Sequence, residues 1–106
     1  MNEKYNKFFK NVLELRGEKC IRHRDITTLI AMTQILDFEH IRDIRKKTIV
    51  NLTDIDKSDV TKSIKILKEY NIILEKENGY LLNENLNAED EIMKNSIYEK
   101  ITKDDN

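Results

Sequence analysis

The sequence predicts a mainly α-helical domain with one small β-hairpin, and three observations support this fold class. The chain has 106 residues, a common size for a single domain, and its 39% hydrophobic residues supply one core. It has no proline and two glycines, so few positions interrupt a helix. Apolar residues recur at helical spacing over most of its length, whereas residues 72–83 surround an Asn-Gly pair typical of a hairpin.

We expect one domain over residues 1–101 and a disordered tail over residues 102–106. No apolar run reaches the roughly 18 residues of a membrane-spanning helix, and the first residues lack the layout of a secretory signal. The single cysteine, Cys20, cannot form an intramolecular disulfide, which agrees with a reducing compartment. These features predict a cytoplasmic protein with no membrane partner.

The net charge of -1 conceals an asymmetry along the chain. Residues 1–71 carry 15 Lys/Arg against 11 Asp/Glu, a balance of +4, whereas residues 72–106 carry 4 against 9, a balance of -5. Because the two parts can lie apart in space, the acidic end need not neutralise the basic body. A nucleic-acid ligand is therefore compatible with this nearly neutral chain.

The first helix is expected to end near Gly17. Its apolar face follows the helical repeat and comprises Tyr5, Phe8, Phe9, Val12 and Leu13. Phe8 and Phe9 are an alternative stacking platform for bases, but their aliphatic neighbours at helical spacing favour packing. We therefore expect this face to cover the core.

A second helix is expected from Asp25, as its N-cap, through Asp37. Its apolar positions cover more than one stripe, which predicts burial on most sides. These positions are Ile26, Leu29, Ile30, Met32, Thr33, Ile35 and Leu36. Such a helix needs more than one partner, so it forms either the centre of the domain or one side of a dimer contact.

Residues 40–43 are candidates for a short strand that pairs with the later hairpin, and a helix is expected over about residues 44–53. Ile49 and Leu52 are expected to face inward on this helix. Ile55 follows the next turn and is expected to close the contact with the helix after it.

The following helix is expected from Ser58 to Tyr70, because the serine hydroxyl can accept hydrogen bonds as an N-cap. At about 100° per residue, Val60, Ile64 and Leu67 form one buried seam. A helix about 10–12 Å wide fits the major groove of DNA while long cationic side chains reach phosphates and base edges. The outward residues are Thr61, Lys62, Lys65 and Lys68. A solvated lysine face without a ligand is the alternative.

A hairpin is expected over residues 72–83, where two apolar runs flank Asn78-Gly79. These two residues are expected to supply the positive φ angles of a tight turn. Two glutamates lie at the tip and would repel phosphates. The candidates for contacts with the DNA backbone or minor groove are Lys76, Asn78 and Tyr80. A hairpin that merely completes the sheet is the alternative.

Asn87 can cap a last helix through about Ile101, with acidic residues in its first turn, where the helix dipole favours anions. Its apolar residues are Ile92, Met93, Ile97 and Ile101. They cover only part of one face. This helix is therefore expected either to pack on the first helix or to meet its copy in a homodimer.

The order of elements over residues 44–83 predicts a winged helix-turn-helix, with the hairpin as its wing and extra helices at both ends. The first helix of such a motif crosses the DNA backbone, so cations at its entrance strengthen binding without specifying sequence. Those cations are Arg42, Arg45, Lys46 and Lys47. An exposed charged helix end is the alternative. Lys19, Arg22 and Arg24 are weaker candidates, because the sequence does not fix their position relative to the motif.

Residues 49–68 and 79–86 resemble the winged-helix domains of plasmid and phage replication proteins, in particular plasmid RepL-type initiators. The resemblance implies double-stranded DNA as the partner. By this resemblance, DNA contacts are assigned to Lys57, Ser58, Thr61, Lys62 and Lys65. Asp54 occupies the turn position at which this family usually has glycine, and aspartate can enter the left-handed region.

The sequence does not predict catalysis, a metal site or a cofactor. Cys20, His23 and His40 do not complete the four ligands of a structural zinc site. Cys20 is expected to be a small core residue, and the two histidines surface or partly buried side chains. The two glycines cannot form a phosphate-binding loop, and no nucleophile-base-acid signature is present.

We therefore expect a sequence-specific double-stranded DNA-binding protein of a mobile genetic element, a plasmid or phage, acting in transcription control, replication or DNA transfer. An accessory protein of the relaxosome at a plasmid transfer origin is a more specific alternative. The alternative from another class is a protein-interaction module that does not bind DNA. Homodimerisation through the N- or C-terminal helix would extend the DNA site.

Overall fold

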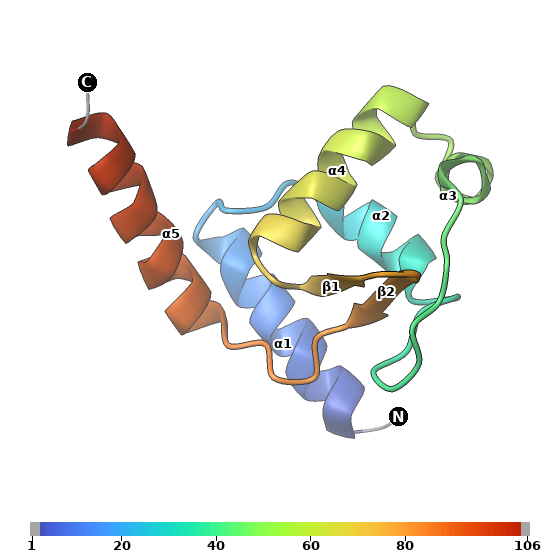
Figure 1. Cartoon of the computed structure of the whole chain (residues 1–106), viewed down its shortest axis with the longest axis horizontal. Helices are drawn as coiled ribbons and strands as arrows, with labels where there is room; N and C mark the ends of the chain where they lie inside the picture. The colour runs from blue at the N-terminus through green and yellow to red at the C-terminus, as the bar shows by residue number, and fades with distance from the viewer. Residues whose placement is uncertain (1–2, 105–106) are drawn as a thin grey trace.

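The computed structural model describes the backbone of residues 3–104 and the side chains of residues 3–96. This part of the chain is mainly helical with one two-stranded antiparallel hairpin, which confirms the predicted fold class (Figure 1). The elements in chain order are α1 (Glu3–Gly17), α2 (His23–Met32), α3 (Lys46–Thr53), α4 (Lys57–Glu69), β1 (Ile73–Lys76), β2 (Gly79–Leu82) and α5 (Ala88–Asp104).

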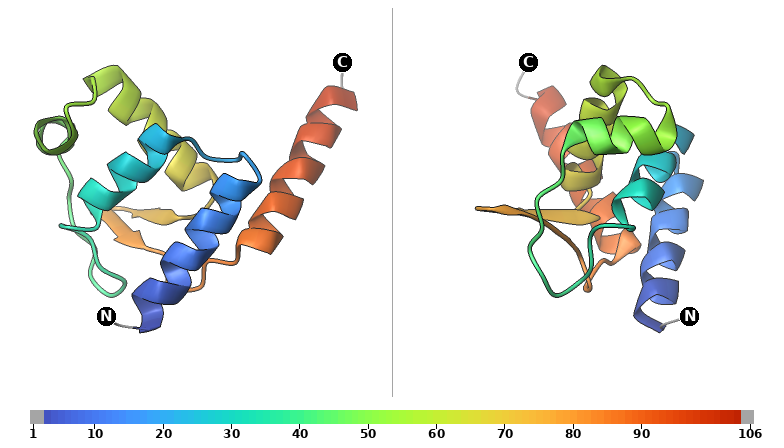
Figure 2. Two further views of the ribbon diagram at one scale, coloured as in Figure 1. Left: turned by 180° about the vertical axis from the view of Figure 1, so that it is seen from behind. Right: turned by 90° about the vertical axis from the view of Figure 1, so that its right-hand side faces the viewer.

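Two sets of contacts organise the fold. Helices α2, α3 and α4 pack on one another, and β1 contacts α4, whereas α1 packs along α5. Figure 2 shows α2 lying across α4 on the side opposite the hairpin, with α1 and α5 side by side. Fully buried side chains from these elements form one core, including those of Leu15, Leu29, Ile49, Leu67 and Leu82.

Helix α1 buries a narrower face than its sequence predicts. Phe8, Val12 and Leu15 are buried, whereas Leu13 is 58% exposed, so the expected position of Leu13 was wrong. The ring of Phe8 lies 5.3 Å from that of Phe9 and 5.4 Å from that of Phe38, both edge to face. These contacts show Phe8 packed in the core.

Helix α2 is shorter than expected and begins earlier. Arg22 is its N-cap, and Asp25, the predicted N-cap, is the third helical residue. The Asp25 carboxylate accepts a hydrogen bond from the Arg22 backbone N–H at 2.8 Å, so it caps the helix from inside. The helix ends at Met32 instead of Asp37. After Thr33 the backbone forms turns with bonds three residues back, from the Gln34 N–H to the Ala31 carbonyl and from the Ile35 N–H to the Met32 carbonyl. Ile30 is 50% exposed, so this helix is not buried on most sides.

Helix α3 starts at Lys46, two residues later than expected, and buries Ile49. Leu52, predicted to face inward, is 50% exposed. The turn into α4 passes through Asp54 in the left-handed region at φ 60°, as the sequence suggested. Helix α4 then starts at Lys57 with Asp56 as its N-cap, so the prediction of Ser58 as N-cap was wrong.

The predicted seam of α4 is confirmed. Val60 and Leu67 are completely buried and Ile64 is 6% exposed. The helix ends because Asn71 takes a left-handed conformation at φ 54°, and the Ile72 N–H donates to the Leu67 carbonyl at 2.9 Å. This is a Schellman-type cap, which leads directly into β1.

The hairpin forms, but its loop differs from the prediction by one residue. Lys76 pairs with Gly79, so Glu77 and Asn78 form the loop. Among these residues Gly79 alone has a positive φ, at 150°, which corrects the expectation for Asn78. The segment expected to be a short strand reduces to one antiparallel bridge. The Arg42 N–H donates to the Tyr80 carbonyl at 2.9 Å, and the Tyr80 N–H donates to the Arg42 carbonyl at 2.8 Å.

The backbone of Arg42 lies so close to position 79 that this position requires glycine. A Cβ atom at position 79 would lie 2.3 Å from the Arg42 carbonyl oxygen. Gly79→Ala should therefore lower the free energy of unfolding by about 2 kcal/mol in urea titrations. Gly17→Ala is the matched control, because a Cβ at position 17 meets no atom within 4 Å, and it should leave stability unchanged or raise it. Equal effects of the two substitutions would contradict this account.

Helix α5 packs back on α1, which is one of its two expected placements. The Asn87 side chain accepts a bond from the Glu89 N–H at 3.2 Å, as predicted for its cap. The helix continues to Asp104, so residues 102–104 are helical and not a disordered tail; neither proline nor glycine follows Ile101 to stop it. The side chains of Ile97 and Ile101, and residues 105–106, lie outside the described part. Within that part, no helix is both long and apolar enough to cross a membrane.

Candidate nucleic-acid interface

The exposed face of α4 carries the five residues that the resemblance assigned to DNA contact. Exposed residues are Lys57, Ser58, Thr61, Lys62 and Lys65. Because the opposite face is buried in the core, α4 is held with this surface outward. Within the described side chains, Lys57, Lys62 and Lys65 form no ion pair with a carboxylate, so their charges face solvent.

Lys68 differs from the other lysines of α4. It is half-buried, and its Nζ lies 3.2 Å from Glu75 Oε2 in β1. Hydrogen bonds from Lys68 and from the Tyr80 hydroxyl lower the pKa of Glu75. Burial and the hydrogen bond to Glu75 raise the pKa of Tyr80. Lys68 and Tyr80 therefore already hold a carboxylate between them at the hairpin edge of α4.

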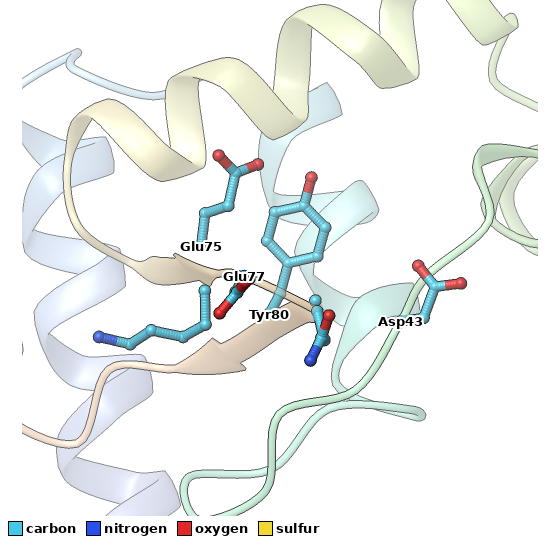
Figure 3. Close-up of a pocket in the computed structure, with 7 residues that line it drawn as sticks. Asp43, Glu75, Glu77 and Tyr80 are labelled. Carbon is cyan, nitrogen blue, oxygen red and sulfur yellow. The ribbon is translucent and has the colours of Figure 1, made fainter.

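The hairpin borders an acidic groove. A cavity of about 620 Å³ lies between the hairpin and Asp43, and its lining includes Glu75, Glu77 and Tyr80 (Figure 3). The lining holds three carboxylates and one lysine, Lys76. Lys76 and Asn78 are exposed at the tip. This charge disfavours a phosphate in the groove and favours a hairpin that completes the sheet.

The cations at the entrance to α3 lie in two environments. Arg42 is joined to β2 by its backbone bridge, and its Nη2 lies 3.4 Å from Asp37 Oδ2. Arg45 is the N-cap of α3, and Lys46 and Lys47 form its first turn. These three side chains are exposed and have no ion pair with a carboxylate of the described residues. Arg45, Lys46 and Lys47 are therefore available to an anionic ligand.

Asp37 organises the segment that leads to this entrance. Its carboxylate accepts bonds from the backbone N–H groups of Glu39 at 2.9 Å and His40 at 2.7 Å. The bond from His40 and then that from Glu39 hold the pKa of Asp37 well below its usual range. A lowered folded-state pKa stabilises the protein above the ordinary value of 3.8, and this contribution is lost as the pH falls through the lowered pKa.

Asp37→Asn tests this acid dependence, because the amide oxygen can still accept both backbone bonds. The wild-type chain should be more stable than the variant at neutral pH, and the difference should shrink as the pH falls below about 4. Urea unfolding at a series of pH values measures it. Glu39→Gln removes a neighbouring exposed carboxylate and should show a smaller pH dependence. A stability difference that is constant with pH would contradict the role of Asp37.

The opposite edge of α4 gathers cations that the sequence did not connect with the motif. Lys62 and Lys65 line a cavity of about 560 Å³ together with side chains from the connection between α1 and α2 and from the first turn of α2. Those cationic side chains are Lys19, Arg22 and Arg24. Residues 19–24 and 62–65 are brought together by the packing of α2 on α4. No local sequence pattern could show this proximity.

A buried polar network fixes this packing. Asp25 is 1% exposed and accepts a hydrogen bond from the Ser63 hydroxyl of α4 at 2.7 Å. The Arg24 guanidinium lies between two carboxylates, with Nε 3.7 Å from Asp25 Oδ1 and Nη1 3.2 Å from Asp59 Oδ1. Ser63 is completely buried, and sequence periodicity alone did not assign it a role. The network therefore ties the first turn of α2 to the middle of α4.

Within the described residues, the three candidate metal ligands do not belong to a group of side chains that could hold a metal ion. His23 and His40 are exposed, and Cys20 is half-buried at the lining of the cationic cavity and packs against the edge of the core. Within the residues that the structure describes, no group of three His, Cys, Asp or Glu side chains is placed to hold a metal ion.

Comparison with known proteins gave no match to a family model, to a curated protein or to a solved structure.

Proposed function

We propose that this chain is a winged helix-turn-helix domain that binds double-stranded DNA, without catalysing a reaction. Helix α4 is the recognition helix, α3 is the helix that crosses the backbone, and the β1–β2 hairpin is the wing. The observation that carries the proposal is the division of α4 into two faces. One face buries Val60, Ile64 and Leu67, and the other presents Lys62 and Lys65 to solvent.

Three further features support this function. The order α2, the Arg42 bridge, α3, α4 and the hairpin has the elements that such a motif requires. The turn between α3 and α4 is tight, with Asp54 in the left-handed region. The basic entrance of α3 lies at the end of a segment that is fixed by its bridge to β2. Phosphate contacts at that entrance would orient α4 in the major groove.

Fluorescence anisotropy with short random-sequence duplexes over a salt series tests the proposal. Binding through lysines and arginines releases counterions, so the affinity should fall steeply as salt rises. A selected site should then bind more tightly than random sequence at the same salt concentration. Absence of binding at low salt would contradict the proposed function.

We further propose that this domain serves a mobile genetic element, in transcription control, replication or DNA transfer. The support is the resemblance of residues 49–68 and 79–86 to replication proteins of plasmids and phages. Genomic neighbours test the role, because a relaxase, a replication origin or a divergent promoter each indicates a different process. A relaxase neighbour would indicate an accessory protein at a transfer origin.

A protein-interaction module is the second candidate function. Two observations favour it: the acidic hairpin groove, and the exposed apolar side chains of Leu13 on α1 and Met93 on α5. The anisotropy experiment separates the two functions, because this module would not bind a duplex even at low salt.

A homodimer is a compatible proposal, since α1 and α5 pack together and each carries one of these exposed side chains. Sedimentation equilibrium measures the oligomeric state. Leu13→Glu should shift a dimer toward monomer, and a monomeric wild-type chain would contradict the dimer.

A further inference from the structure

A cationic groove lies along the edge of α4 that faces α2. We define the α2 groove by its cationic lining, which comprises Lys19, Arg22, Arg24, Lys62 and Lys65. Its volume is about 560 Å³. The view from behind in Figure 2 shows the start of α2 lying against α4 on this side. The groove is therefore next to the face of α4 that is proposed to read DNA.

The charges in the α2 groove are not balanced from within the described structure. Its lining holds two carboxylates, Asp25 and Glu69, against five cations. Asp25 is already engaged, because it accepts bonds from the Arg22 backbone and from Ser63. Arg24 pairs with Asp59, which leaves four cations in the groove without an ion pair to a described carboxylate. Such an arrangement attracts an anionic ligand.

Two of these cations are held by the backbone at fixed points. Lys19 has a left-handed φ of 61° in the cap of α1, where its N–H donates to the Arg16 carbonyl at 2.9 Å. Arg22 is the N-cap of α2, and its N–H is bonded to Asp25. The backbone positions from which these two cationic side chains extend are therefore fixed beside the groove.

The two edges of the exposed α4 face are electrostatically opposite. On the hairpin edge, Lys68 is paired with Glu75, and the lining of the neighbouring groove holds three carboxylates and one lysine. On the α2 edge, Lys62 and Lys65 continue into the cationic groove. A DNA strand that flanks α4 on the hairpin edge would meet repulsion near the tip, whereas a strand on the α2 edge would meet cations.

Resting on the proposed function, we infer that the α2 groove binds backbone phosphates of the DNA strand that flanks α4 on its α2 edge. The hairpin groove stays clear of the phosphates, and the entrance of α3 supplies the contacts on the other strand. The domain thus holds DNA from the start of α2 instead of from its wing. Lys19 and Arg22 are the positioning contacts that this inference adds to the recognition helix.

The variant Arg22→Gln with Lys19→Asn tests the inference. Asparagine tolerates the left-handed backbone at position 19, and neither side chain makes an ion pair with a described carboxylate, so folding should be preserved. Loss of two phosphate contacts should weaken random-duplex binding and reduce the slope of log affinity against log salt by about 2. A melt monitored by circular dichroism verifies that the variant is folded.

Lys76→Gln at the hairpin tip is the matched control, and it should leave affinity and salt slope nearly unchanged. The reverse pattern, with a loss for Lys76→Gln and none for the groove variant, would overturn the inference while leaving DNA binding intact. An equal loss of slope per removed charge in both variants would also overturn it. Absence of duplex binding by the wild-type chain would overturn the proposed function and this inference together.

Cys20 provides an independent readout that needs no substitution. It is the chain's single cysteine and lies half-buried in the lining of the α2 groove. Saturating duplex should slow alkylation of Cys20 by neutral iodoacetamide severalfold, whereas inorganic phosphate at the same phosphate concentration should not. Full reactivity in the duplex complex would overturn the inference. Equal protection by inorganic phosphate would overturn it in favour of a free-phosphate site.

Discussion

Lys62→Glu together with Lys65→Glu should abolish duplex binding, with affinity falling by about a hundredfold or more at moderate salt. Both lysines are exposed on α4, and both line the α2 groove. The double variant removes two cations and places two carboxylates against the phosphate backbone, so attraction becomes repulsion. Neither lysine has an ion pair with a described carboxylate, and the melting curve should therefore be nearly unchanged. Fluorescence anisotropy and circular dichroism measure the two effects.

Lys7→Glu together with Lys10→Glu on α1 is the matched control. Both lysines are exposed, and the change in net charge is the same, but they lie on a helix that packs with α5 and not with α4. This control should retain most of the affinity, losing only the long-range part that salt screens. If the α4 variant bound duplex as tightly as the control, α4 would not be the recognition helix.

The sequence predicted the elements better than their ends. The apolar seam of α4 has a strict helical repeat, so Val60, Ile64 and Leu67 could be placed in the core from spacing alone. The start of the same helix could not be placed, because Asp56 and Ser58 are both good N-cap residues and the sequence does not distinguish between them; in the structure Asp56 is the N-cap. Leu13 and Leu52 were misplaced for a related reason, since periodicity does not show where a neighbouring helix stops covering a face.

The candidate interface divides in the same way. Lysines on α4 and at the entrance of α3 are close in sequence to the motif, so local pattern was enough to propose them. The α2 groove depends on a contact between Asp25 and Ser63, which are 38 residues apart. A buried serine and a buried aspartate resemble ordinary surface residues in a sequence. The cations beside them could therefore not be placed until α2 and α4 were seen together.

The acidic character of the hairpin groove was predictable only in part. Glu75 and Glu77 lie at the tip in the sequence, but Asp43 joins them because Arg42 bridges to Tyr80. That bridge also shows why Gly79 is needed at the edge of β2. Local sequence thus predicted a hairpin, whereas its surroundings came from a contact between segments far apart in the chain.

Asp25→Ala should be the most destabilising substitution outside the apolar core, lowering the free energy of unfolding by about 3 kcal/mol. The Asp25 carboxylate is 1% exposed and accepts bonds from Ser63 at 2.7 Å and from the Arg22 N–H at 2.8 Å. Its loss leaves the Ser63 hydroxyl buried without its acceptor and removes one of the two carboxylates beside Arg24. Urea unfolding followed by circular dichroism measures the change.

A double-mutant cycle with Ser63→Ala separates the network from simple loss of volume. Ser63→Ala alone should cost about 1–2 kcal/mol, because it removes one hydrogen bond to a charged acceptor. The double variant should be less destabilised than the sum of the two single variants, by about 1 kcal/mol, since both remove the same bond. Additive effects would show that Asp25 and Ser63 act separately. The packing of α2 on α4, and with it the shape of the α2 groove, would then depend on the apolar contacts and on the Arg24–Asp59 ion pair.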